Sequence, residues 1–196
     1  MTYFDVFGLP CKLVLDVSAL ERAFYKLSRK LHPDLYAQAT MQEQQWSLEQ
    51  TSLLNDAYRT LKDPVRRTEY LLRLEGVEIE RDKSSGDEKK DSRVPADLLE
   101  EVFELNMQLE EMRMSQKMGE DDRQLRSDLE KAKAQFEGQL ADFDAQLQSL
   151  WGEWDAALDA DGSLAKEDAK NRMVALLDRR RYVRNLVRDV NEALEI

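Results

Sequence analysis

Apolar residues recur at helical spacing over long stretches of this 196-residue chain. The longest stretch runs from Leu125 to Trp154 without a proline, and its apolar positions are three or four residues apart. This spacing places the apolar side chains along one side of a helix. No stretch of useful length alternates apolar and polar residues as a half-buried strand would. The sequence therefore predicts an all-α protein.

A polar segment divides the chain into two parts. From residue 80 to residue 93 every residue except Gly86 is polar or charged, so this segment cannot pack in a core. Residues 1–76 carry ten basic and ten acidic groups, whereas residues 77–196 carry the whole net charge of −11. We expect an N-terminal domain at 1–76, a polar linker at 77–94 and a C-terminal helical domain at 95–196.

Two amphipathic helices are predicted in the first domain. One begins at the capping box Ser18-Ala19-Leu20-Glu21 and ends near His32, because a proline disfavours helical geometry in the residue before it. The face opposite its apolar side is basic: Arg22, Lys26, Arg29 and Lys30. The second helix pairs with it, and the pair should bury Phe24, Leu27, Trp46, Leu54 and Tyr58. Asp63-Pro64 begins a third, short helix, which Gly76 ends.

The second domain is predicted to be a bundle of three long helices. The first follows Pro95, and its apolar stripe consists of Leu98, Val102, Leu105, Leu109 and Met112. The second carries the long stripe from Leu125 to Trp154, and a turn at 159–163 separates it from the third. The stripe of the third helix consists of Met173, Leu176, Val183, Val187, Val190 and Leu194. Spacings near 3.5 residues indicate coiled-coil-like packing.

Composition argues against several classes of function. The acidity argues against nucleic acid or an anionic membrane as the main partner, and no stretch has the ~20 apolar residues of a membrane helix. The start resembles neither a signal nor a transit peptide, so we expect a cytoplasmic protein. With one cysteine, Cys11, and one histidine, His32, we expect no disulfide, metal site or cofactor. No nucleotide-binding or nucleophile motif occurs, which favours a binding protein over an enzyme.

The tripeptide His32-Pro33-Asp34 follows the basic-faced helix and precedes the loop to its partner helix. This arrangement resembles the J domain of DnaJ-type co-chaperones, as do the opening Tyr3-Phe4-Asp5-Val6-Phe7-Gly8-Leu9 and the segment 54–61 followed by Asp63-Pro64. The resemblance implies binding to a DnaK/HscA-type chaperone and stimulation of its ATPase. The implied chaperone-binding residues are His32, Pro33, Asp34, Arg22, Lys26, Arg29 and Lys30.

Over its whole length the chain resembles the HscB-type, or Jac-type, co-chaperones of iron–sulfur cluster assembly. The most specific matches are Arg66-Arg67-Thr68-Glu69-Tyr70-Leu71-Leu72 and the segment 99–106, and no Gly/Phe-rich or cysteine-rich module follows the J domain. The resemblance implies that the C-terminal domain binds the iron–sulfur scaffold protein, which is delivered to the chaperone. The implied scaffold-binding residues are Leu99, Phe103, Glu104, Glu111 and Tyr182.

The first helix of the bundle supports a partner site independently of the resemblance. Leu99, Phe103 and Met107 lie about 100° to 180° around the helix from Leu98, away from the predicted core. Carboxylates flank them at Glu100, Glu104 and Glu111. An exposed apolar strip of this kind commonly marks an interaction site, so Met107 joins the expected scaffold-binding residues. Two positions depart from the family pattern, because Glu100 stands where an apolar residue is frequent and Met107 where an acidic one is.

Three other interpretations stay open at the level of sequence. The chain could be a J-domain adaptor for a different client, bound through the same bundle. It could be a structural helical protein in which the tripeptide is incidental. An enzyme that uses His32 and Asp34 ranks last, because no nucleophile or pocket is evident near them.

Overall fold

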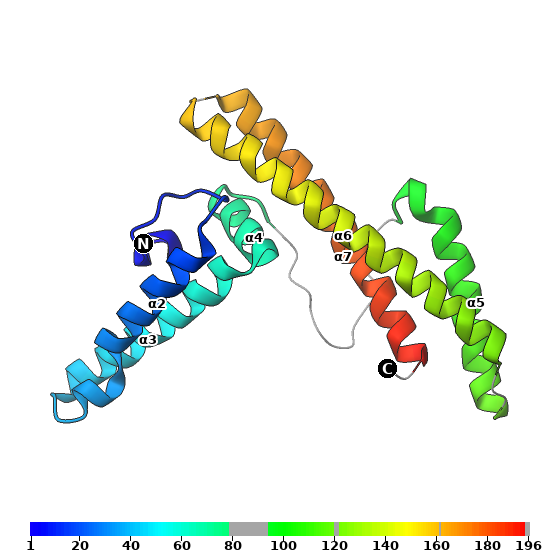
Figure 1. Cartoon of the computed structure of the whole chain (residues 1–196), viewed down its shortest axis with the longest axis horizontal. Helices are drawn as coiled ribbons and strands as arrows, with labels where there is room; N and C mark the ends of the chain where they lie inside the picture. Colours follow the sequence, from blue (N-terminus) through cyan, green and yellow to red (C-terminus); the bar gives the residue numbers. More distant parts are fainter. Residues whose placement is uncertain (79–93, 120–121, 161, 195–196) are drawn as a thin grey trace. The chain divides into compact units, whose positions relative to one another are not determined.

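The computed structural model describes residues 1–78, 94–119, 122–160 and 162–194. Over these residues it contains α-helices and short 3₁₀ helices and no strand, which confirms the predicted all-α class (Figure 1). Most of the predicted linker at 77–94 lies outside the described residues.

The chain divides into two compact units. One consists of Met1–Arg81 and Leu150–Lys170, and the other of Asp82–Ser149 and Asn171–Ile196. The first unit thus includes a segment from the expected C-terminal domain. The domain boundaries expected from the sequence stay a prediction.

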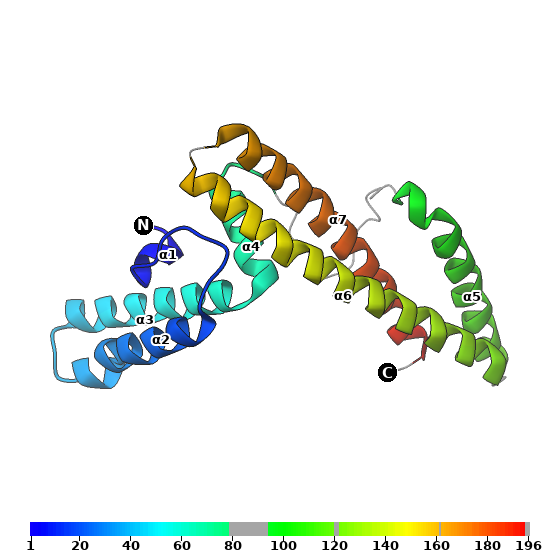
Figure 2. The ribbon, with the colours of Figure 1, turned by 45° about the horizontal axis from the view of Figure 1, so that its top comes forward.

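The N-terminal part of the first unit is a helical hairpin. The short helix α1 (Tyr3–Val6) precedes the hairpin, and α4 (Pro64–Leu74) follows it. The helices α2 (Val17–Leu31) and α3 (Met41–Lys62) lie side by side in both views (Figures 1 and 2), and the loop that joins them carries the 3₁₀ helix η1 (Pro33–Tyr36). The elements in chain order are α1 (Tyr3–Val6), α2 (Val17–Leu31), η1 (Pro33–Tyr36), α3 (Met41–Lys62) and α4 (Pro64–Leu74).

Local capping explains where these helices begin. The Asp16 carboxylate accepts a hydrogen bond from the Ala19 backbone N–H at 3.0 Å and caps α2. The predicted capping box at Ser18 is therefore wrong, because Asp16 caps the helix two residues earlier. Asp63 caps α4 with Pro64 at its first position, as predicted. Gly76, with φ of 80°, follows the end of α4 in the left-handed conformation that favours glycine.

The interface of α2 and α3 is less buried than predicted. Of the five side chains expected to be buried there, Leu54 is buried, whereas Phe24, Leu27 and Tyr58 are half-buried and Trp46 is exposed. Leu20, Leu54, Ala57 and Leu61 are buried, and the half-buried ring of Phe24 stacks on Tyr58 at 4.1 Å between centroids. The prediction that Trp46 is buried is wrong, because its side chain is 46% exposed. Ser47 is buried in its place and donates a hydrogen bond to the last α2 carbonyl, while Trp46 lies about 100° away around α3.

The end of α6 (Arg123–Asp159) from Leu150 onward and the start of α7 (Ser163–Leu194) up to Lys170 also belong to the first unit. The buried Asp155 carboxylate accepts backbone hydrogen bonds from Leu13 and Val14, each at 2.9 Å. Trp151 Nε1 donates to Thr68 Oγ1 at 2.9 Å, and the Arg67 guanidinium lies 4.8 Å from the centroid of the Trp151 ring. Burial lowers the pKa of Arg67.

In the second unit α5 (Leu99–Met118), the part of α6 before Leu150 and the part of α7 after Lys170 form a bundle of three helices, with the 3₁₀ helix η2 (Ala96–Leu98) before α5. The stripes predicted for the first and third helices are buried throughout. Polar bonds join the helices at their edges: Gln135 and Gln139 of α6 donate to Glu101 of α5, and Gln116 of α5 donates to the Ala193 carbonyl of α7.

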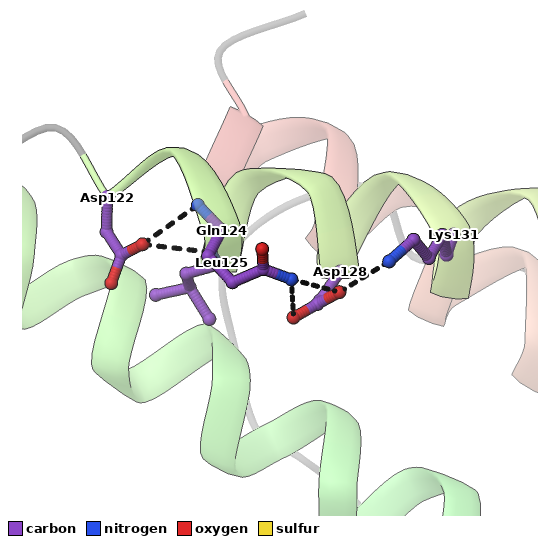
Figure 3. Close-up of polar contacts among 5 residues, drawn as sticks. All are labelled: Asp122, Gln124, Leu125, Asp128 and Lys131. Atoms are coloured by element: carbon purple, nitrogen blue, oxygen red, sulfur yellow. Dashed lines mark hydrogen bonds and ion pairs between the residues drawn. The ribbon is translucent and has the colours of Figure 1, made fainter.

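A cluster of short-range polar contacts stabilises the start of α6 (Figure 3). Asp122 Oδ1 accepts the backbone N–H groups of Gln124 and Leu125, both at 3.0 Å. One turn further on, the Asp128 carboxylate accepts hydrogen bonds from Lys131 and Gln124, which lower its pKa. The Asp122 contacts satisfy backbone donors that the first turn of any helix leaves free.

Candidate partner-binding surfaces

The tripeptide His32-Pro33-Asp34 lies where the chain leaves α2 and enters η1. Proline at 33 ends α2, because His32 has an extended ψ of 128°. The His32 Nδ1 atom lies 3.3 Å from the Asp34 backbone nitrogen and 3.4 Å from Asp34 Oδ2. The imidazole and the carboxylate are both exposed, at 54% and 88% of their side chains.

Side chains of α3 fix the position of this loop. Ser47 and Thr51 donate hydrogen bonds from their hydroxyls to the Leu31 carbonyl, at 2.7 and 3.0 Å. The Gln44 side-chain amide donates to the carbonyls of Ala37 and Ala39, at 3.3 and 3.1 Å. The tripeptide is therefore held from both sides, by the end of α2 and by the return of the chain to α3.

The predicted basic residues of α2 are all exposed, which places them on the outer face of the hairpin. Arg22 makes a long ion pair with Asp16, at 3.8 Å, and its side chain is 71% exposed. Arg29 and Lys30 lie in the last turn, where positive charge is favourable toward the helix dipole. Together with the exposed His32 and Asp34 they form a charged surface at the end of α2.

A second surface lies on α5, and we refer to it as the α5 strip: Leu99, Phe103, Met107, Met114 and Met118. These side chains are between 54% and 72% exposed, whereas Val102, Leu105 and Leu109 on the other side are buried. The expected exposure of the first three is confirmed. The sequence reasoning missed Met114 and Met118, although their spacing from Met107 continues the same helix face. The carboxylates predicted beside the strip, Glu104 and Glu111, are exposed, as is Glu100.

Tyr182 on α7 is half-buried. Burial raises the pKa of its phenol, and the nearby Asp189 carboxylate adds to that shift. Its role in scaffold binding stays a prediction.

The described residues contain neither a candidate metal site nor a membrane-spanning helix. No group of three or more His, Cys, Asp or Glu residues in that part of the chain could hold a metal ion. None of the helices found there is long and apolar enough to cross a membrane.

Comparison with known proteins identifies the N-terminal segment. Residues 2–70 match the DnaJ domain family, which confirms the resemblance to J domains. Two curated proteins of Vibrio cholerae serotype O1, from strains O395 and El Tor Inaba N16961, are each named Co-chaperone protein HscB homolog. Each is 47% identical to the chain over 79 residues, which are 40% of this chain and 46% of the relative. The match thus spans about half the length of these relatives.

Solved structures extend the similarity to the whole chain. The chaperone HscB from Vibrio cholerae superposes with a TM-score of 0.59 over 99% of both chains, at 29% sequence identity. The crystal structure of human co-chaperone protein HscB gives a TM-score of 0.64 over 98% of this chain and 81% of that chain. At 23% identity the human protein shows the fold alone.

Proposed function

We propose that this chain, which resembles the HscB-type J-domain co-chaperones, acts as a co-chaperone in iron–sulfur cluster assembly. The observation that carries the proposal is the presence, in one chain, of a DnaJ domain with an exposed His-Pro-Asp tripeptide and of an HscB-like fold from end to end. The cluster is cargo on the scaffold protein. Its ligands come from elsewhere, because this chain has a single cysteine.

The chaperone-binding part of the proposal concerns the end of α2 and the loop after it. The tripeptide contacts the DnaK/HscA-type chaperone, and the exposed basic residues Arg22, Lys26, Arg29 and Lys30 attract an acidic surface of that partner. Attraction between opposite charges raises the association rate and weakens as salt is added. The co-chaperone favours the hydrolysis-competent state of its partner, so the hydrolysed ATP belongs to the chaperone and the chain itself is not an enzyme.

The scaffold-binding part concerns the α5 strip and its flank. Leu99, Phe103 and Met107 supply the apolar contact, and Glu104 and Glu111 beside them select for a partner with basic groups at the matching positions. Tyr182 adds a contact from α7. The buried opposite side of α5 supports this role, because a helix held by its packed side presents its exposed side chains at little ordering cost on binding.

Delivery connects the two surfaces, since one chain can hold the scaffold protein while it stimulates the chaperone. Linking two binding surfaces raises the local concentration of one partner near the other. We place this activity in the cytoplasm, where a reducing environment suits both the free cysteine and iron–sulfur chemistry.

A second candidate is a J-domain adaptor that carries a different client. The observation in its favour is Met107, which is 60% exposed at a position where the family frequently has an acidic residue. Met114 and Met118 lengthen the strip beyond the expected residues and fit a longer apolar client surface.

Direct binding measurements separate the two candidates. Calorimetry with the purified scaffold protein should give a complex that Phe103→Ala weakens and that Leu164→Ala does not. Leu164 is 87% exposed on α7 and lies outside the strip, so it is a matched apolar control. If the scaffold protein does not bind, the iron–sulfur role is wrong and the adaptor role is favoured, provided that the chaperone ATPase still responds.

A further inference from the structure

An exposed apolar cluster lies beside the His-Pro-Asp tripeptide, and we call it the loop cluster: Leu35, Tyr36 and Trp46. Leu35 is 67% exposed and Trp46 is 46% exposed. The rings of Tyr36 and Trp46 meet edge to face, with centroids 5.9 Å apart and planes 61° apart. Trp46 is the exposed tryptophan of the chain, since Trp151 and Trp154 are 7% and 1% exposed.

The loop cluster is continuous with the tripeptide along the backbone. Asp34, Leu35 and Tyr36 belong to the same 3₁₀ helix, η1. The Leu35 backbone N–H donates to the His32 carbonyl at 2.9 Å, and the Ala39 N–H donates to the Tyr36 carbonyl at 2.9 Å. A protein surface that covers His32 and Asp34 therefore reaches the neighbouring side chains of η1.

The turn of α3 that carries Trp46 is held in place by hydrogen bonds from residues on both sides of Trp46. Gln44 donates to the carbonyls of the loop, and Ser47 donates to the Leu31 carbonyl at the end of α2. Thr40 and Glu43 form a reciprocal capping box that begins α3. The indole is thus presented on a fixed turn of helix, next to the loop that those bonds position.

We propose that the loop cluster is an additional contact for the DnaK/HscA-type chaperone, with Trp46 as its aromatic anchor. This inference rests on the proposed function and deepens it. Two aromatic side chains of low conformational entropy, half-exposed and in mutual contact, have the composition of an interface hot spot. The basic residues of α2 supply attraction over distance, and the loop cluster supplies apolar contact once the tripeptide is engaged.

The first test separates affinity from maximal stimulation. Trp46→Ala should raise the concentration of this protein that gives half-maximal chaperone ATPase at least fivefold and leave the maximal rate unchanged. Leu48→Ala is the matched control, because Leu48 is 53% exposed on the same helix and lies about 200° around it from Trp46. That variant should behave as the wild type, whereas His32→Gln should lose the maximal stimulation itself.

The second test needs no destabilising variant. Iodide quenching of tryptophan fluorescence in the wild-type protein reports mainly on Trp46, because the other two tryptophans are buried. The same measurement on the Trp46→Phe protein gives the quenching of all other tryptophans, those of the chaperone included, and is subtracted. Saturating chaperone should at least halve the quenching that is specific to Trp46.

Each alternative outcome is decisive. Unchanged quenching at saturating chaperone, or a Trp46→Ala protein with the wild-type half-maximal concentration, overturns the inference and leaves the proposed function intact. Protection from quenching that grows with protein concentration in the absence of chaperone assigns the loop cluster to a second copy of this chain and overturns it as well. No stimulation by the wild-type protein refutes the proposed function and this inference together.

Discussion

Replacement of Phe103 by alanine tests the α5 strip at its centre. The Phe103 side chain is 68% exposed, so most of its surface is free to be covered by a partner and little of it supports the bundle core. We therefore expect the variant to fold normally and to bind the scaffold protein more weakly.

The magnitude follows from the exposed area. A phenylalanine offers about 200 Å² of surface to burial, at about 25 cal/mol per Å², so covering the exposed 68% gives at most about 3 kcal/mol. Alanine retains part of that contact, and hot-spot truncations commonly cost about 1–3 kcal/mol, which corresponds to a five- to 150-fold rise in Kd. The cost in folding stability should stay within about 0.5 kcal/mol, as for other surface positions.

The assay is titration calorimetry of the scaffold protein with wild type, Phe103→Ala and the control Leu164→Ala. Thermal unfolding of each variant is measured in parallel. An unchanged Kd for Phe103→Ala would move the binding site off the strip. A large loss of stability would show that Phe103 packs in the fold, contrary to its exposure.

Three further outcomes follow from named contacts. His32→Gln should abolish stimulation of the chaperone ATPase and leave thermal unfolding unchanged. His32 is exposed, and its described contacts lie within its own loop. Normal stimulation by the variant would contradict the J-domain mechanism. Asp155→Ala should destabilise the first unit by about 3 kcal/mol and lower its Tm. The reason is that the backbone N–H groups of Leu13 and Val14 lose charge-assisted hydrogen bonds to the carboxylate. A Tm equal to that of the wild type would contradict this. The hydroxyl and backbone of Thr40 hold the pKa of Glu43 below its ordinary value, so its capping contribution is complete at neutral pH and is lost as the pH falls through the lowered pKa. Glu43→Gln should flatten the acid-range dependence of Tm, and an unaltered slope refutes this.

Periodic burial was the part of the fold that sequence patterns predicted well. Leu98, Val102 and Leu105 face the bundle core because a helix repeats every 3.6 residues, and no distant contact is needed to place them. The same argument correctly predicted that Phe103 and Met107 are exposed. It could have reached Met114 and Met118 had the spacing been followed to the end of α5.

Tertiary contacts explain the failures. Trp46 belongs to the apolar pattern of its helix, yet Ser47 occupies the buried position because its hydroxyl satisfies the carbonyl at the end of α2. Trp151 lies beside the predicted stripe of α6 and is buried nevertheless, since it packs on Arg67 and bonds to Thr68. No local sequence pattern could predict these partners of Trp151, because they lie more than eighty residues away in the sequence.

The most direct test of the central claim is the steady-state ATPase rate of the DnaK/HscA-type chaperone, measured with this protein, with the scaffold protein, and with both. The co-chaperone account predicts that the two together stimulate more than the sum of their separate effects. Stimulation by this protein that is indifferent to the scaffold protein would contradict the delivery role, and no stimulation at all would contradict the account as a whole.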